Sequence, residues 1–102
     1  MTADGELTVA DAPERSRFEL RRGDELLGVA EYRPGGGDRL IIAHTEIEDG
    51  HEGEGLGSTL VRTMLDQLRA GGRTIMPLCE FTAAYVARHP EYADLVDPSF
   101  RR

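Results

Sequence analysis

The sequence predicts a mixed α/β (α+β) fold, in which a mostly antiparallel sheet carries one parallel strand pair and two main helices. Two observations lead to this prediction. The first half of the chain holds three strand-like runs joined by short glycine and proline breaks, as in an antiparallel meander. The second half holds an amphipathic helix between two strand-like runs, and that order places the two strands parallel.

The N-terminal half supplies the meander. Residues 1–15 are small and acidic and lack periodicity, so we expect a mobile tail before a domain at 16–97. Strand-like runs follow at 18–20, 26–32 and 39–47, and a short tail is expected at 98–102. In the third run, strand alternation would place Ile42, His44 and Glu46 on one face.

The C-terminal half supplies the helices. One apolar stripe of 3.6-residue period is formed by Leu56, Leu60, Val61, Met64, Leu65 and Leu68. Gly71-Gly72 ends this helix, and residues 73–79 then form a buried strand in which Pro77 marks a bulge or an edge. A second helix is expected from Glu80 to about His89, followed by a short helical turn at 91–96.

Composition excludes several classes of function. A net charge of −7 argues against nucleic-acid binding. All 12 basic residues are arginine, so lysine Schiff-base chemistry is excluded. The single cysteine excludes an internal disulfide. No apolar run is long enough for a membrane span and no signal peptide is evident, so we expect a cytoplasmic protein without membrane contact.

The glycine loop Gly53-Glu54-Gly55-Leu56-Gly57-Ser58 lies between a strand and a helix. Free backbone N–H groups and the helix dipole make such a terminus an anion site, which favours a phosphate-bearing ligand over a solvated loop. The acids around it are Glu46, Glu48, Asp49, Glu52 and Glu54. They are either solvated or attract a cationic substrate. A metal site is disfavoured because no EF-hand spacing is present.

These residues carry a resemblance. Glu52-x-x-Gly55-x-Gly57 resembles the acyl-CoA motif of GCN5-related N-acetyltransferases, although Glu52 stands where arginine or glutamine is usual. Over residues 17–96 the chain resembles the compact YjdJ-like subgroup, through the motifs His44-Thr45-Glu46, Pro77-Leu78-Cys79, Ala84-Tyr85 and His89-Pro90-Glu91-Tyr92.

The resemblance implies acetyl-CoA as co-substrate and acetyl transfer to an amine acceptor of unknown identity. The acids near the glycine loop make a cationic amine one candidate, and no metal is expected. It implies that the strand 39–47 and the strand ending at Cys79 splay apart for the pantetheine arm. The cofactor-binding residues would be Glu46, Ile47, Gly53, Glu54, Gly55, Leu56, Gly57 and Ser58. The alternative is a non-catalytic CoA-binding or protein-interaction module.

Three residues are candidates for catalysis. His44 titrates near neutrality and could deprotonate an amine with Glu46 orienting it, or it could be a hydrogen-bonded structural histidine. Cys79 precedes a helix, which favours its thiolate, and could accept the acetyl group or only line the pocket. By resemblance, Tyr85 could protonate the departing CoA thiolate, or it could pack in the core.

Overall fold

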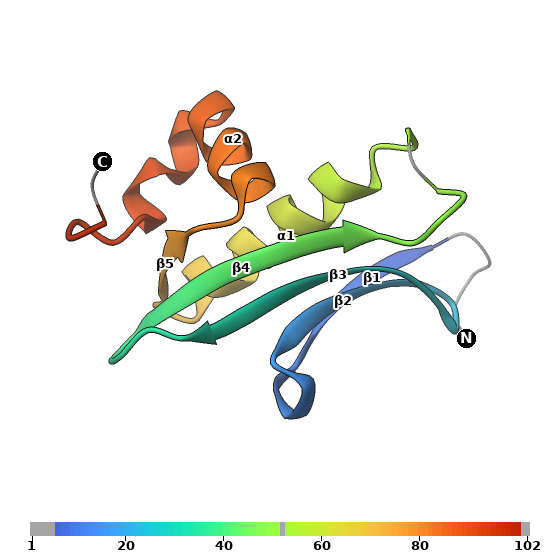
Figure 1. The fold of residues 1–102 in the computed structure, drawn as a ribbon, viewed down its shortest axis with the longest axis horizontal. Helices are drawn as coiled ribbons and strands as arrows, with labels where there is room; N and C mark the ends of the chain where they lie inside the picture. The colour runs from blue at the N-terminus through green and yellow to red at the C-terminus, as the bar shows by residue number, and fades with distance from the viewer. Residues whose placement is uncertain (1–5, 52, 101–102) are drawn as a thin grey trace.

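The computed structural model describes residues 6–51 and 53–100. Five strands form one sheet in the order β1-β2-β3-β4-β5 (Figure 1). The strands are β1 (Leu7–Ala12), β2 (Arg17–Arg22), β3 (Glu25–Pro34), β4 (Arg39–Ile47) and β5 (Thr74–Pro77). The helices are α1 (Leu56–Ala70) and α2 (Glu80–Arg88), with short 3₁₀ helices η1 (Pro13–Arg15) and η2 (Pro90–Leu95).

The sheet is mixed, as the sequence predicts. Strands β1 to β4 pair antiparallel in succession, and β4 pairs parallel with β5 after the crossover through α1. Helices α1 and α2 join the inner face of the sheet in one hydrophobic core. The predicted stripe of α1 is buried in that core from Leu56 to Leu68. We call the opposite face of the sheet, on which Glu19, Glu31 and His44 lie, the open face.

The segment Leu7–Arg15 differs from the sequence expectation. A mobile tail was expected over residues 1–15, but Leu7–Ala12 forms edge strand β1 along β2, so the expectation is wrong for this segment. Leu7 and Val9 pack against the core, and the Gln67 side chain donates a 2.8 Å hydrogen bond to the carbonyl of Val9. Residues 1–5 of the expected tail, and the last two of the expected C-terminal tail, lie outside the described residues.

A bulge in β4 changes which residues share a face. Glu31 of β3 pairs with His44, but the next residue of β3, Tyr32, pairs with Ile42, so one residue of β4 is extra. The expectation that Ile42 shares a face with His44 is therefore wrong. Ile42 is fully buried on the inner face, whereas His44 is exposed on the open face. Thr45, next in the chain, returns to the inner face.

Strands β4 and β5 separate after four paired positions. The pairs run from Arg39 with Thr74 to Ile42 with Pro77, and residues 43–47 of β4 have no registered partner in β5. The Cys79 backbone N–H still donates a 2.9 Å hydrogen bond to the carbonyl of Ile42. Beyond this bond the chain turns into α2, which confirms the expected splay. Pro77 ends the edge strand β5, where its missing N–H is tolerated.

Candidate active site

The glycine loop forms a pocket at the start of α1. The pocket has a volume of about 280 Å³. It is lined by Ile47, His51, Gly53, Gly55, Leu56, Gly57, Ser58 and Phe81, which include six of the eight residues expected to bind a cofactor. The first turn of α1 contains no acidic residue, so the positive end of the helix dipole is not neutralised from within the helix.

Glycine is required at two positions of the loop for different structural reasons. Gly55 is the N-cap of α1 and adopts a left-handed conformation, with φ of 75°, that side chains rarely allow. Gly57 has no such φ, but a Cβ atom there would lie 2.7 Å from the Phe81 ring. Gly55 is therefore required by its backbone conformation and Gly57 by close packing against α2.

The two acidic residues among those expected to bind the cofactor, Glu46 and Glu54, are in different places relative to the pocket. Glu46 is on the open face of β4, where its side chain points away from the pocket. Glu54 places a carboxylate oxygen 3.4 Å from Nδ1 of His51. Glu52, the position that departs from the family motif, lies outside the described residues.

His51 is a pocket residue that the sequence analysis did not single out. Its Nε2 atom lies 3.3 Å from a Glu25 carboxylate oxygen, and its buried Nδ1 atom makes no hydrogen bond of ordinary geometry despite the nearby Glu54. Glu25 begins β3, 26 residues earlier in the chain. No local pattern signals that contact, because only the fold brings β3 to the loop.

Phe81 and Leu78 are large apolar side chains that remain exposed at the start of α2. Their exposed fractions are 41% and 59%. Phe81 forms one wall of the pocket against Gly57, so part of its exposed surface faces the pocket. An apolar wall next to a helix N-terminus suits a ligand that has an anionic part and an apolar arm.

Cys79 is the N-cap residue of α2 and is buried. Its Sγ atom lies 3.4 Å from Oγ1 of Thr45, across the splay. Burial, the largest single influence, raises the pKa of the thiol. Hydrogen bonding with the Thr45 hydroxyl and with the N–H groups of Thr82 and Phe81 outweighs burial, so the pKa of Cys79 lies below its usual value.

His44 lies on the open face with Glu46. Their Nε2 and Oε1 atoms are 3.3 Å apart, and the His44 side chain is 55% exposed. The expected pairing of His44 with Glu46 is therefore present. Thr45 is on the inner side of the same strand and contacts Cys79, the N-cap of α2, so the structure does not bring His44 and Cys79 onto one face.

Tyr85 lies on α2 and is buried in the hydrophobic core. Its ring stacks on His89, with centroids 4.1 Å apart, and lies 6.0 Å from the ring of Tyr92. Tyr92 in turn donates a 2.7 Å hydrogen bond to Asp66 of α1. Tyr85 thus joins α2 to η2, which is the packing alternative that the sequence analysis left open.

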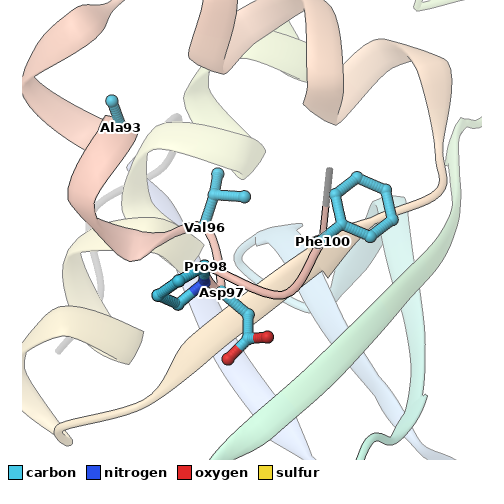
Figure 2. Close-up of a pocket in the computed structure, with 5 residues that line it drawn as sticks. All are labelled: Ala93, Val96, Asp97, Pro98 and Phe100. Carbon is cyan, nitrogen blue, oxygen red and sulfur yellow. The ribbon is translucent and has the colours of Figure 1, made fainter. Parts of the chain in front are cut away.

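A second, smaller pocket of about 170 Å³ lies at the C-terminal end and is lined by Ala93, Val96, Asp97, Pro98 and Phe100 (Figure 2). Asp97 is the one ionisable side chain among them, and its carboxylate is engaged by Ser99 and approached by Arg39 at 3.9 Å. This pocket offers no pair of groups for acid–base chemistry.

Within residues 6–51 and 53–100, no group of three or more histidine, cysteine, aspartate or glutamate side chains is placed to hold a metal ion. In the same part of the chain, no helix combines the length and the apolar character needed to cross a bilayer.

A family model and two solved structures resemble this chain. The model of the GCN5-related N-acetyl-transferase family matches residues 17–95. Among the curated proteins, none matches. The fold matches a GCN5-like candidate N-acetyltransferase from Staphylococcus aureus, with a TM-score of 0.68 and 20% identity over 91% of this chain and 90% of that one.

The fold also matches the ribosomal-protein-S18-alanine N-acetyltransferase of Escherichia coli, with a TM-score of 0.56 and 18% identity. That match covers 74% of this chain and 49% of the enzyme, so this chain spans about half of the enzyme's length. The family match covers most of the chain, and the glycine loop and splayed strands lie within it. The chain belongs to the GCN5-related N-acetyltransferase family.

Proposed function

We propose that this protein is an acetyl-CoA-dependent N-acetyltransferase of the compact YjdJ-like type. The observation that carries the proposal is the placement of the pocket beside the splay. Thr45 and Ile47 share the inner face of β4, and two residues of a strand span about 7 Å. The Cys79–Thr45 pair therefore lies a short step from the pocket wall at Ile47.

This placement suits the three parts of acetyl-CoA. The pyrophosphate would bind the N–H groups at the start of α1, in the pocket from Gly53 to Ser58. The pantetheine arm would lie along residues 43–47 of β4, which lack a partner in β5, with Phe81 as an apolar wall. The thioester would then reach Thr45 and Cys79. In this arrangement Ile47 contacts the cofactor, and Glu46 acts with His44.

The acceptor amine would approach from the open face. Past Ile42 the edge of β4 is not covered by β5, so a group on the open face can reach the thioester around that edge. His44, oriented by Glu46, would take the proton of the attacking amine. Glu31 pairs with His44 across the sheet and Glu46 lies beside it, so carboxylates on this face would favour a cationic acceptor. Tyr85 would support the fold.

Two chemical routes are consistent with this site. In the direct route, the amine nitrogen attacks the thioester carbonyl, the C–S bond to CoA breaks, and the CoA thiolate takes up a proton. In the two-step route, the Cys79 thiolate attacks first and CoA leaves, and the amine then attacks the acetyl-cysteine and regenerates the Cys79 thiolate.

Thermal unfolding with and without acetyl-CoA tests the proposal. Ligand at about 100 times Kd raises the free energy of unfolding by about 2.7 kcal/mol. Acetyl-pantetheine, which lacks the diphosphate, serves as the control. An unchanged melting temperature at millimolar acetyl-CoA would contradict it. Stabilisation without acetylation of any amine in a broad screen would instead indicate a CoA-binding module.

Intact mass after a single turnover separates the two routes. Because the chain has no lysine, an acetyl adduct can form only on Cys79, the N-terminal amine or a hydroxyl. An adduct on the wild type that is absent from Cys79→Ala supports the two-step route. Rapid acetylation of the amine without any adduct supports the direct route.

A further inference from the structure

Helix α2 begins with an unusual N-cap. An N-cap side chain ordinarily accepts a hydrogen bond from the N–H group two or three positions on, and serine, threonine, aspartate and asparagine are preferred there. Here the N-cap is Cys79, in an extended conformation with φ of −69° and ψ of 126°. The N–H groups that need an acceptor belong to Phe81 and Thr82. A thiol is a weak acceptor, whereas a thiolate is a strong one.

Thr82 supplies a second, independent observation at the same place. Its side chain is fully buried, and its Oγ1 atom has no hydrogen-bond partner of ordinary geometry. Thr82 is the third residue of α2 and follows the N-cap Cys79 by three positions, so its side chain lies on the same side of the first turn as the Cys79 side chain. A buried hydroxyl without a partner is unfavourable, and most are satisfied. This one becomes satisfied when the sulfur is negative, because it can then donate its hydrogen to the sulfur.

The groups around the sulfur are uncharged. Strand β4 presents the Thr45 hydroxyl, α2 presents two N–H groups and the Thr82 hydroxyl, and α1 buries apolar side chains in the same core. The charged groups of these elements lie elsewhere. In α2, Glu80 and Arg88 are exposed, and in α1 Arg62, Asp66 and Arg69 are exposed. In β4, His44 and Glu46 are on the open face and Arg39 lies near Asp97. Hydrogen-bond donors, rather than a neighbouring cation, therefore stabilise a negative charge here.

We propose that Thr82 is a positioning residue that holds the Cys79 sulfur in its thiolate form by donating the hydroxyl hydrogen to it, opposite Thr45. The thiol proton leaves to solvent, and the sulfur then accepts from the Thr82 hydroxyl and from the N–H groups of the first turn of α2. The consequence for acetyl transfer rests on the proposed function, but the stabilisation of the thiolate does not.

The experiment measures the pH dependence of alkylation by iodoacetamide without acetyl-CoA. Cys79 is the only cysteine in the chain, so the rate reports on this thiol alone. Thr82→Val keeps the shape and removes the hydroxyl, and Thr82→Ser keeps the hydroxyl. We expect Thr82→Val to raise the midpoint of the profile by about one pH unit, which is about a tenfold lower rate below the midpoint, and Thr82→Ser to keep the wild-type midpoint.

Thiolate absorbance near 240 nm gives a second measurement that does not need access to the buried sulfur, with Cys79→Ser as the blank for tyrosine absorbance. If Thr82→Val does not fold, Thr82→Ala is compared with Thr82→Ser. Equal midpoints for the wild type and the hydroxyl-free variant would overturn the proposal. A shifted midpoint in a protein that transfers no acetyl group would overturn the proposed function and leave the role of Thr82 standing.

Discussion

Thr45 and Cys79 are 34 residues apart in the chain, and their Oγ1 and Sγ atoms lie 3.4 Å apart. The contact joins the free inner edge of β4 to the N-cap of α2. It marks the closed end of the splay between β4 and β5, because the Cys79 N–H bonds to the Ile42 carbonyl just before it. The proposed reaction centre is therefore defined by a strand and a helix cap that both belong to the hydrophobic core.

The first prediction concerns the packing of Gly57 against Phe81. In Gly57→Ala, the new methyl group would meet the Phe81 ring at 2.7 Å, so the ring must move or the loop must shift. We expect a loss of about 1–3 kcal/mol in the free energy of unfolding, as for other overpacked sites, and weaker binding of acetyl-CoA. Urea unfolding and titration calorimetry measure the two effects.

Phe81→Ala combined with Gly57→Ala is the matched control. Removing the ring gives the methyl group room, so the loss in the double variant should be smaller than the sum of the single losses. If the losses in the free energy of unfolding are additive, the 2.7 Å contact with the Phe81 ring is not the reason that position 57 requires glycine.

The second prediction concerns His51 in the pocket. It lies at the glycine loop between two carboxylates, and its Nδ1 atom makes no hydrogen bond of ordinary geometry. A hydrogen bond to a charged group contributes about 1.5–3 kcal/mol. We therefore expect His51→Ala to raise the Kd of acetyl-CoA at least tenfold. The comparison is His89→Ala, which removes a histidine outside the pocket. Equal Kd values for the two variants would contradict a contact between His51 and the diphosphate.

Features of this site that depend on neighbouring residues in the sequence were predictable, and those that depend on contacts between distant segments were not. The α1 stripe and the glycine loop follow from local periodicity and chain order, whereas the splay was expected from the family resemblance. The sequence placed Ile42 on the face of His44 and Glu46, which is wrong, because a one-residue bulge in β4 reverses the alternation after Ile42. The bulge depends on pairing with β3 and leaves no mark in the residues 39–47 themselves.

Contacts between distant segments were also not predictable. His51 enters the pocket beside Glu25, and Phe81 covers Gly57; in each case the partner comes from another element. Strand β1 was missed because its alternation is weak and contains few bulky β-branched residues. Its place is determined by a complete antiparallel register with β2 and by Gln67 of α1.

The third prediction concerns His44 and Glu46 on the open face. If His44 accepts a proton from the attacking amine, His44→Gln should lower kcat by about 10²–10⁴-fold and leave the Kd of acetyl-CoA unchanged. Glu46→Gln should lower kcat less, because it removes only the 3.3 Å partner that orients the ring. Steady-state kinetics with saturating acetyl-CoA measure both. Glu25→Gln, at the partner of His51, is the matched control for loss of a histidine-bound carboxylate.

The last prediction concerns stability at low pH. Glu19 is nearly buried on the open face, and it contacts three arginines: Arg15 and Arg17 at one carboxylate oxygen and Arg21 at the other. The hydrogen bond from Arg21 is the largest influence and lowers the pKa of Glu19; burial opposes it, and the other two arginines lower it further. The resulting pKa is about 2, against an ordinary value of 4.5.

Because the pKa in the folded state lies below that in the unfolded state, the contribution of Glu19 is complete above about pH 4.5 and is lost as the pH falls toward 2. We expect Glu19→Gln to lower the free energy of unfolding at pH 7 by about 1–3 kcal/mol, since three guanidinium groups lose their ionised partner. The difference from the wild type should narrow between pH 4.5 and 2. Urea unfolding at a series of pH values measures it, with the exposed Glu31→Gln as control. A difference that stays constant down to pH 2 would show that the ionised carboxylate is not the stabilising partner.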